Sequence, residues 1–205
     1  YNQQGQTWNQ PPWLPEALAE AGYAPLRDMI RTLLRHAGAL RIDHVIGLFR
    51  LWWIPAGGSP AAGTYVRYDH DAMIGVLMLE AVSAGAVLIG EDLGNVEPWV
   101  SDYLSDRGIL GTSVLWFERE GDGFRPPEHY RRSLLATVNT HDLPPTAGYL
   151  ADEHVALRAR LGLLTRPVEE ELADADAERA AVLAVLRDRG LLADAASEAQ
   201  VIEAL

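Results

Sequence analysis

The chain has 205 residues, of which 48% are hydrophobic and 22% are charged, and its formal net charge is −12. The hydrophobic content is typical of a globular protein. The negative charge argues against binding to a nucleic-acid backbone, which requires clustered lysine and arginine. Because the chain contains no cysteine, disulfide bonds and thiolate zinc sites are excluded.

No segment of the sequence is predicted to cross a membrane or to direct secretion. The longest apolar run, Val76–Ile89, is interrupted by Glu80 and Ser83 and is shorter and more polar than a transmembrane helix. No signal peptide is recognised near the first residue. Because that residue is Tyr1 and not methionine, we interpret the chain as a fragment of a longer protein.

The first half of the chain alternates between predicted helices and strands. Residues 1–15 are rich in glutamine, asparagine, glycine and proline and are predicted to form an irregular loop. From Glu16 to Gly38, apolar residues recur at spacings of three and four, which indicates a helical region. The next elements are predicted as a strand at Ala39–Ile46, a helix at Asp71–Ala84 capped by Asp71, and a buried strand at Ala86–Gly90.

The second half continues the alternation and then becomes wholly helical. Its first elements are predicted as a helix at Val96–Asp106, a strand at Gly111–Phe117, a short helix near Glu128–Arg132 and a strand at Leu135–Asn139. Residues 151–189 are rich in alanine, leucine, glutamate and arginine, which predicts two or three helical segments separated at Pro167. Gly190 ends one segment and Ser197 begins another.

The order of these elements determines the expected fold class. Strands separated by helices form a parallel sheet with helical crossovers, so the chain is predicted to be α/β. A doubly wound sheet and a (β/α) barrel both satisfy this order. Between the first two strands, Leu51–His70 contains proline and glycine and is interpreted as an insertion at the active-site end.

Three of the four predicted strands end in segments that contain acidic residues. They stand in the segments Arg41-Ile42-Asp43-His44, Gly90-Glu91-Asp92-Leu93-Gly94 and Asn139-Thr140-His141-Asp142. In a barrel, the C-terminal ends of all strands open on one face, where catalytic groups gather. This placement favours a barrel and predicts that Asp43, Glu91 and Asp142 line one pocket.

The three carboxylates suit cleavage of a glycosidic bond with retention of configuration, which requires two carboxyl groups about 5–5.5 Å apart. Asp43 is interpreted as the nucleophile, because Arg41 projects to the same side of the strand and favours the ionised form. Glu91 is interpreted as the general acid and base, since a nearby negative charge favours its protonated form. Asp142, with His141 beside it, would hold sugar hydroxyls and stabilise the oxocarbenium-like ring.

Each of these residues also has a structural interpretation. A single carboxylate at a strand end is more often a helix cap or a loop anchor, and Arg41 and Asp43 alone are compatible with a structural ion pair. Asp92 is the alternative acid, although it points to the opposite side of an extended strand. Trp52 and the adjacent Trp53 are compatible with a sugar-stacking platform and equally with packing at the rim of the sheet.

Three segments resemble the sequence motifs of the amylomaltases, also called 4-alpha-glucanotransferases or disproportionating enzymes, which belong to the alpha-amylase clan. These segments are Arg41–Gly47, Gly90–Gly94 and Thr140–Pro144, in the order and spacing of the family. Gly5–Asn9 also resembles the family's segment before this part of the barrel. The resemblance covers residues 1–150.

The resemblance implies a (β/α)8 TIM barrel, of which this chain would supply about strands four to seven with their helices. Residues 1–150 would form this part of the catalytic barrel. Residues 151–205 would form a helical segment that continues the barrel domain or makes an inserted subdomain. Members of the family need no cofactor and are usually cytoplasmic, so no metal site and no contact with nucleic acid or membrane is expected.

The resemblance also implies a reaction, the transfer of an alpha-1,4-linked glucan segment from a malto-oligosaccharide donor to a sugar acceptor. Asp43 matches the nucleophile, Glu91 the acid/base and Asp142 the transition-state stabiliser. The substrate-contacting positions expected from the resemblance, or from their place near these carboxylates, are Arg41, His141, His44, Gln6, Trp8 and Trp52.

Three other functions stay open from the sequence. A hydrolytic relative of alpha-amylase would use the same carboxylates with water as the acceptor. A metal-dependent barrel hydrolase would use Asp43, His44, His141 and Asp142 as ligands. The third is an inactive glucan-binding fragment, because an open half-barrel exposes sheet edges. We therefore expect the isolated chain to be inactive or poorly folded.

Overall fold

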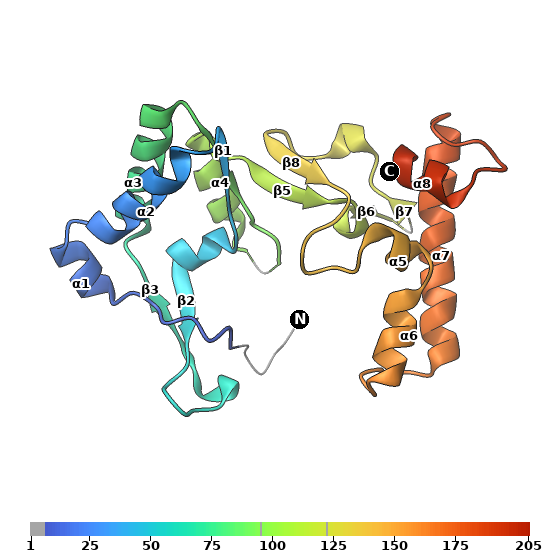
Figure 1. The fold of residues 1–205 in the computed structure, drawn as a ribbon, viewed down its shortest axis with the longest axis horizontal. Coiled ribbons are helices and arrows are strands. Elements are labelled where there is room, and N and C mark those ends of the chain that lie inside the picture. The colour runs from blue at the N-terminus through green and yellow to red at the C-terminus, as the bar shows by residue number, and fades with distance from the viewer. Residues whose placement is uncertain (1–6, 95, 122) are drawn as a thin grey trace. The chain divides into compact units, whose positions relative to one another are not determined.

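The structure is a computed structural model that describes residues 7–94, 96–121 and 123–205 (Figure 1). By the density of its internal contacts the chain divides into two compact units. Unit 1 comprises Tyr1–Thr112 and Ser133–Leu135, and unit 2 comprises Ser113–Arg132 and Ala136–Leu205. Both units contain helices and strands, so the described residues have a mixed α/β architecture, as the alternation of elements predicts.

Two parallel strands form the centre of unit 1. Strand β1 (Ala39–Ile42) pairs in parallel with β4 (Val87–Gly90), and Ile42 lies opposite Gly90. Helix α3 (His70–Ala84) stands between these strands in the sequence, so the unit contains the helical crossover that parallel pairing requires. The carboxyl ends of β1 and β4 therefore lie at the same edge of the sheet.

The other edge of β4 is paired as well. The amide of Gly90 donates to the carbonyl oxygen of Leu110 at 2.7 Å, and the bridge there is parallel. This segment leads directly into β5 (Gly111–Val114), whose first amide donates to the carbonyl oxygen of Ser133 at 3.1 Å. Ser133 precedes β8 (Leu134–Thr137), so unit 1 contains the beginnings of both later strands.

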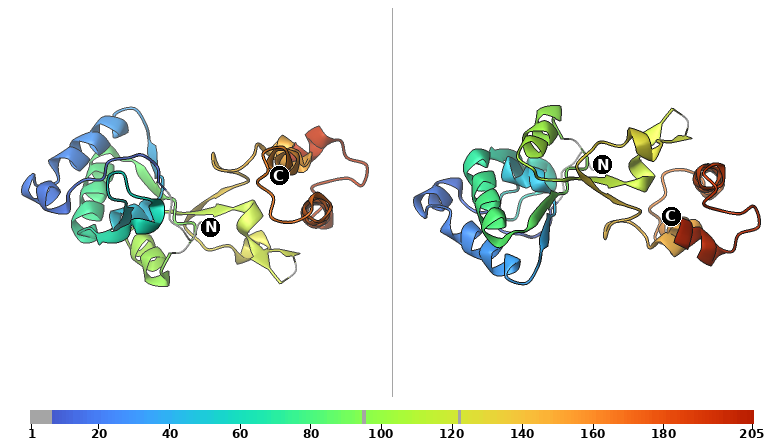
Figure 2. Two further views of the ribbon diagram at one scale, coloured as in Figure 1. Left: turned by 90° about the horizontal axis from the view of Figure 1, so that it is seen from below. Right: turned by 90° about the horizontal axis from the view of Figure 1, so that it is seen from above.

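Helices cover this sheet through a continuous apolar core. Helix α2 (Ala24–Leu34) packs side by side with α3 (Figures 1 and 2). The described part of the unit also contains α1 (Pro15–Glu20) and α4 (Pro98–Asp106). The core side chains that are almost fully buried are Leu26, Val45, Ile74, Leu77, Val100, Leu104 and Ile109. Burial of each large aliphatic side chain contributes about 1.5–3 kcal/mol.

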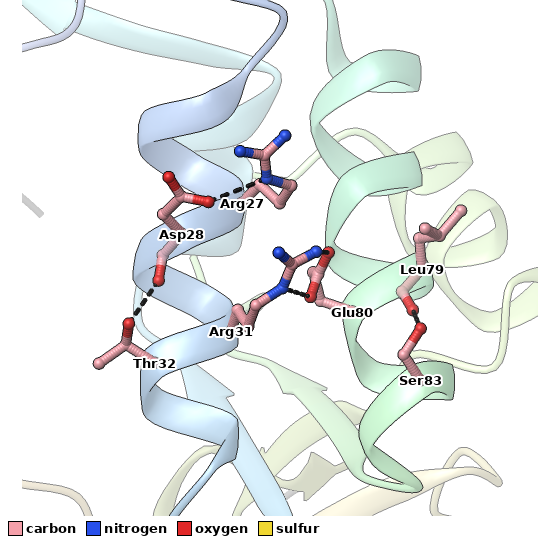
Figure 3. A network of polar contacts seen from close by, with 7 residues as sticks. All are labelled: Arg27, Asp28, Arg31, Thr32, Leu79, Glu80 and Ser83. Carbon is pink, nitrogen blue, oxygen red and sulfur yellow. Dashed lines mark hydrogen bonds and ion pairs between the residues drawn. The ribbon is translucent and has the colours of Figure 1, made fainter.

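An ion pair between the half-exposed Arg31 and the buried Glu80 joins α2 to α3 (Figure 3). Both nitrogens of the Arg31 fork donate to the Glu80 carboxylate, Nε to Oε2 at 2.8 Å and Nη2 to Oε1 at 2.7 Å. The Glu80 side chain is only 5% exposed. The hydrogen bonds from Arg31 lower the pKa of Glu80, so this acid, which interrupts the apolar run of α3, is kept ionised and paired.

A β-hairpin occupies the predicted insertion between β1 and α3. Strands β2 (Arg50–Trp53) and β3 (Thr64–Arg67) pair in antiparallel fashion, with Trp52 opposite Tyr65. An ion pair of 2.8 Å between Arg50 and Glu97 attaches this hairpin to the segment that follows β4. The insertion is therefore an ordered element of unit 1 and not an irregular loop.

Unit 2 is mainly helical. Its helices are α5 (Thr146–Leu150), α6 (Glu153–Arg160), α7 (Val168–Asp188) and α8 (Glu198–Ala204), and a short hairpin joins β6 (Arg119–Glu120) to β7 (Gly123–Phe124). Helices α6 and α7 lie side by side, and Figure 1 shows α7 along its length as one uninterrupted helix. Ser197 and Gln200 form a capping box, which confirms the predicted start of α8.

Several predicted boundaries are corrected by the structure. The strand predicted at Ala39–Ile46 ends at Ile42, because His44 adopts a left-handed backbone conformation and turns the chain into a 3-10 turn at Val45–Leu48. The single helical region predicted from Glu16 is two helices, since Gly22 and Tyr23 both have positive φ angles.

Smaller differences concern caps and short elements. Asp69 and not Asp71 caps α3, because its Oδ1 atom accepts the amide of Ala72 at 3.0 Å. The strand predicted at Gly111–Phe117 ends at Val114 and continues as a 3-10 turn. The helix predicted near Glu128–Arg132 is a 3-10 turn at Pro127–His129, where proline residues set the backbone.

The two compact units are divided at other positions than residue 150. The expected division separates a barrel part at residues 1–150 from a helical segment at residues 151–205. It stays a prediction. Within the described ranges, none of the helices combines the length and the apolar character needed to cross a membrane.

Candidate active site

Asp43 and Glu91 occupy equivalent positions at the ends of neighbouring parallel strands. Each follows directly after a paired residue, Asp43 after Ile42 and Glu91 after Gly90. The pairing continues past the strands, since the Glu91 amide donates to the carbonyl oxygen of Ile42 at 2.8 Å and the Val45 amide donates to that of Glu91 at 3.0 Å. Neighbouring strands lie about 4.8 Å apart, which suits two carboxyl groups that act on one bond.

Close packing maintains this arrangement of the two strand ends. Val45 is fully buried, and it lies against Gly90 so tightly that a Cβ atom at position 90 would come within 3.0 Å of Val45 Cγ1. A side chain at position 90 would require Val45 to shift, so glycine suits this close approach of the turn after β1 to the end of β4. The glycine before Glu91 is therefore part of what sets the position of the two carboxylates.

The Asp43 carboxylate is paired with Arg41, as the sequence predicts. Arg41 Nη1 donates to Asp43 Oδ1 at 2.7 Å. The Asp43 side chain is 57% exposed, so it is accessible from solvent while the guanidinium supports its negative charge. An exposed, ionised carboxylate is the form that a nucleophile requires.

The Glu91 carboxylate is oriented by two backbone amides. The amide of His44 donates to Glu91 Oε2 at 2.9 Å, and the amide of Leu93 donates to Glu91 Oε1 at 2.6 Å. These two hydrogen bonds hold the plane of the carboxylate in one orientation.

Asp92 faces other partners. Ser101 Oγ donates to Asp92 Oδ2 at 3.1 Å, and the Thr112 amide donates to Asp92 Oδ1 at 3.0 Å. The buried Thr112 hydroxyl also donates to the carbonyl oxygen of Gly90 at 3.1 Å. These contacts connect the end of β4 with α4 and β5, which gives Asp92 a structural role beside Glu91.

His44 and Trp8 lie together next to Asp43. Their rings meet edge to face at 4.9 Å between centroids and 88° between planes. Burial lowers the pKa of the His44 imidazole below its ordinary value, with Glu91 and Asp43 acting in the opposite direction. The ring of Trp8 is half exposed. Gln6, predicted in the same segment, lies outside the described residues.

Trp52 is fixed inside its own hairpin. Its indole Nε1 donates to the carbonyl oxygen of Pro60 at 3.0 Å, and its ring meets that of Tyr65 at 5.0 Å. A Cβ atom at Gly63 would come within 2.4 Å of the indole nitrogen. These contacts give Trp52 a packing role in the hairpin, and its contact with substrate stays a prediction.

Asp142 and His141 belong to unit 2, in the loop after β8. The amide of Asp142 donates to Thr140 Oγ1 at 3.3 Å, and His141 Nε2 lies 3.4 Å from Asp142 Oδ2. The loop is also shaped by Asn139, whose Oδ1 accepts the Thr140 amide at 2.8 Å. The Asp142 side chain is 76% exposed. Asp43 and Glu91 belong to unit 1, whereas Asp142 belongs to unit 2. The convergence of Asp142 with the other two carboxylates therefore stays a prediction.

The sequence motifs did not reveal the backbone donors of the site. Among the contacts described above, the hydrogen bonds to the Glu91 side chain come from backbone amides, those of His44 and Leu93. Motifs record side chains, whereas the direction of an amide depends on backbone angles. The nearest signal in the sequence is the pair of glycines around Glu91-Asp92-Leu93, since Gly94 has a φ angle of 89°.

The side chains in the described ranges bear on the metal-dependent alternative. No group of three or more histidine, aspartate or glutamate side chains in that part of the chain is arranged to hold a metal ion. The four ligands considered for a metal-dependent hydrolase are instead divided between the two units, Asp43 and His44 in one and His141 and Asp142 in the other.

Comparison with known sequences identifies relatives along the whole chain. The family described as 4-alpha-glucanotransferase matches residues 1–205. A 4-alpha-glucanotransferase of Mycobacterium tuberculosis is 63% identical over 201 residues, which covers 96% of this chain and 28% of the relative. One of Haemophilus influenzae is 39% identical over 170 residues, which covers 83% of this chain and 24% of the relative. The chain thus spans less than a third of these relatives.

Comparison with solved structures gives the same picture. The crystal structure of amylomaltase from Corynebacterium glutamicum has a TM-score of 0.92 and 52% identity, covering 99% of this chain and 30% of that chain. Amylomaltase from Streptococcus agalactiae in complex with acarbose has a TM-score of 0.62 and 19% identity, covering 84% of this chain and 36% of that chain. The second similarity concerns the fold alone.

Proposed function

Because the chain belongs to the 4-alpha-glucanotransferase family, we propose that the protein containing it transfers alpha-1,4-glucan segments between malto-oligosaccharides. One observation carries this proposal: Asp43 and Glu91 stand at equivalent positions on adjacent parallel strands, each with its own hydrogen-bond donors. The donor is a malto-oligosaccharide and the acceptor is another sugar. The chemistry needs no cofactor, and we place the protein in the cytoplasm.

We propose that the fold is part of a (β/α)8 barrel. The parallel order β1, β4 and the start of β5 supports this, together with the TM-score of 0.92 to an amylomaltase. In this proposal β1, β4, β5 and β8 are strands four to seven. Residues 1–150 are the catalytic portion, and residues 151–205 continue it or form an inserted helical subdomain.

The first half of the reaction forms a covalent glycosyl intermediate. Asp43 Oδ attacks the anomeric carbon of the donor, and the glycosidic bond to the leaving sugar breaks. Glu91 transfers its proton to the leaving oxygen, so the shortened sugar departs with a neutral hydroxyl. Asp43 becomes an ester and loses its negative charge, while Glu91 becomes a carboxylate that the amides of His44 and Leu93 stabilise.

The second half transfers the glucan to the acceptor. Glu91 removes the proton from the acceptor's 4-hydroxyl, and that oxygen attacks the anomeric carbon. The ester bond to Asp43 breaks, which restores both carboxyl groups and gives a new alpha-1,4 bond. Asp142 holds hydroxyls of the distorted ring and stabilises its positive charge, with His141 as a hydrogen-bonding neighbour.

The remaining predicted residues contact the substrate in this proposal. Arg41 and His141 line the donor subsite, and His44 and Trp8 extend it beside Asp43, where their rings are in contact. Gln6 belongs to the same segment as Trp8. Trp52 would offer an aromatic face from the hairpin to a sugar ring.

Incubation of the full-length protein with maltotriose tests the proposal. Transfer produces glucose together with longer oligomers, whereas hydrolysis produces only shorter sugars. The Asp43→Asn variant removes the nucleophile and should lower kcat by about 10⁴-fold or more. As a control, both proteins are assayed with EDTA, which would inhibit a metal-dependent hydrolase but leave this reaction intact. Near-wild-type turnover of Asp43→Asn would disprove the assignment.

A further inference from the structure

The peptide bond between Asp43 and His44 connects the two carboxylates of the proposed mechanism. Its carbonyl carbon belongs to Asp43, and its amide nitrogen, which belongs to His44, donates to Glu91 Oε2 at 2.9 Å. The next amide, that of Val45, donates to the backbone carbonyl of Glu91 at 3.0 Å. Two consecutive amides, those of His44 and Val45, thus donate to Glu91, the residue that follows the neighbouring strand β4.

Such convergence is impossible in an extended strand, where successive amides point to opposite edges. It requires a helical or left-handed residue between the two amides. His44 supplies this conformation, with φ at 48° and ψ at 55°. The left-handed backbone at position 44 is therefore the feature that turns the first amide toward the Glu91 side chain.

Left-handed conformations are unfavourable for residues other than glycine, so their surroundings must fix them. The carbonyl oxygen of His44 accepts the Gly47 amide at 2.8 Å, and the imidazole lies against Trp8. On its other side Val45 is fully buried against Gly90. These contacts maintain the strained residue beside the proposed nucleophile.

We infer that His44 is a positioning residue for Glu91, acting through its backbone and not only through its imidazole. Its amide orients the acid/base by a hydrogen bond to Glu91 Oε2. Because the same peptide carries Asp43, the two carboxyl groups are oriented together. The inference rests on the proposed function, since it assigns how one of the proposed catalytic groups is held.

A matched pair of substitutions in the full-length protein separates the two roles of His44. Both His44→Gly and His44→Val remove the imidazole, but glycine readily adopts a positive φ and a β-branched residue does not. We expect kcat with maltotriose to be about 100-fold lower for the valine variant than for the glycine variant. Both variants should show a raised KM, because both lose any contact of the ring with sugar.

The pH profile provides a second readout. The amide of His44 is one of two backbone donors to the Glu91 carboxylate, and a variant that turns this amide away removes a charge-assisted hydrogen bond. The alkaline limb of the kcat profile should therefore move upward in the valine variant and not in the glycine variant. A purely structural defect would reduce the amount of folded enzyme without moving this limb.

A second pair guards against failure of the valine variant to fold. Asparagine adopts left-handed conformations more readily than alanine, so His44→Asn should exceed His44→Ala in kcat. Equal kcat values within each pair would overturn the inference and assign the role to the imidazole alone. If the wild-type protein itself formed no longer oligomers from maltotriose, the proposed function would fail instead.

Discussion

The carboxylates proposed for catalysis are held in two different ways in the two units. In unit 1, Glu91 accepts amides from His44 and Leu93, and its strand is paired on both edges. In unit 2, Asp142 lies in a loop, 76% exposed, with its amide bound to Thr140 of the same loop. The pairing of strands therefore orients the acid/base within one unit, while the orientation of Asp142 depends on local loop contacts.

The strongest test of this difference compares two isosteric substitutions, Glu91→Gln and Asp142→Asn. Both should lower kcat with maltotriose, by about 10²–10⁴-fold for the acid/base and about 10²–10³-fold for the stabilising group. Their effects on stability should differ. Glutamine places an amide nitrogen against one backbone donor at a cost of about 1–3 kcal/mol, whereas asparagine at the exposed position 142 should stay within about 0.5 kcal/mol.

Kinetics and calorimetry on the same preparations check this comparison. A glycosyl fluoride donor adds a control, because fluoride leaves without protonation and should restore the first step in Glu91→Gln but not in Asp43→Asn. Equal losses of Tm in Glu91→Gln and Asp142→Asn would contradict the view that backbone amides hold the side chain of Glu91 more firmly than loop contacts hold that of Asp142.

The packing behind Glu91 gives a smaller expected effect. Gly90→Ala introduces a methyl group within 3.0 Å of Val45 Cγ1, and the resulting overpacking should cost about 1–3 kcal/mol. Differential scanning calorimetry should show a lower Tm, together with reduced kcat because the strand ends separate. Gly75→Ala is the matched control, since nothing lies within 4 Å of that position and alanine favours its helix. The added substitution Val45→Ala should recover part of the loss, and a lack of recovery would point to another cause.

The smallest expected effect concerns pH and His44. Burial lowers the pKa of His44 below its ordinary value of about 6.5. At a pH between the lowered pKa of the folded protein and the ordinary pKa of the unfolded chain, the unfolded chain binds a proton that the folded chain does not. The contribution of the neutral His44 to stability is therefore present above pH 6.5 and is lost as the pH falls. The Tm of His44→Asn should therefore decrease less between pH 7 and pH 5 than that of the wild type. A steeper decrease in the variant would show that the imidazole is protonated in the folded protein.

Alternation of apolar strands and helices was sufficient to predict the α/β class and the place of Glu91 directly after a strand, whereas Asp43 stood inside the strand predicted at Ala39–Ile46, which ends at Ile42. The reason is physical, since a parallel pair places residues that follow its strands at one edge. The pairing of Arg41 with Asp43 was also predictable from the spacing of two residues along a strand.

Other parts of the site depend on interactions that residue types do not reveal. The left-handed conformation of His44 is maintained by contacts with segments that are distant in the sequence. Val45 packs against Gly90, and the imidazole of His44 lies against Trp8. The segment Leu51–His70 was interpreted only as an insertion, although it contains most of the hairpin of β2 and β3. Its prolines and glycines are typical of loops, so the two short strands were not predicted. The cap of α3 was assigned to Asp71 and is Asp69, since adjacent acids are indistinguishable without backbone angles.

The register of β1 and β4 has a consequence for how such a chain tolerates insertions and deletions. The spacing between positions 43 and 91 in space is set by the match of Ile42 with Gly90 and not by the length of polypeptide between them. Lengthening or shortening the tip of the hairpin between Trp53 and Thr64 should leave that spacing unchanged. Removal of one residue inside either strand would instead turn one carboxylate to the opposite face of the sheet.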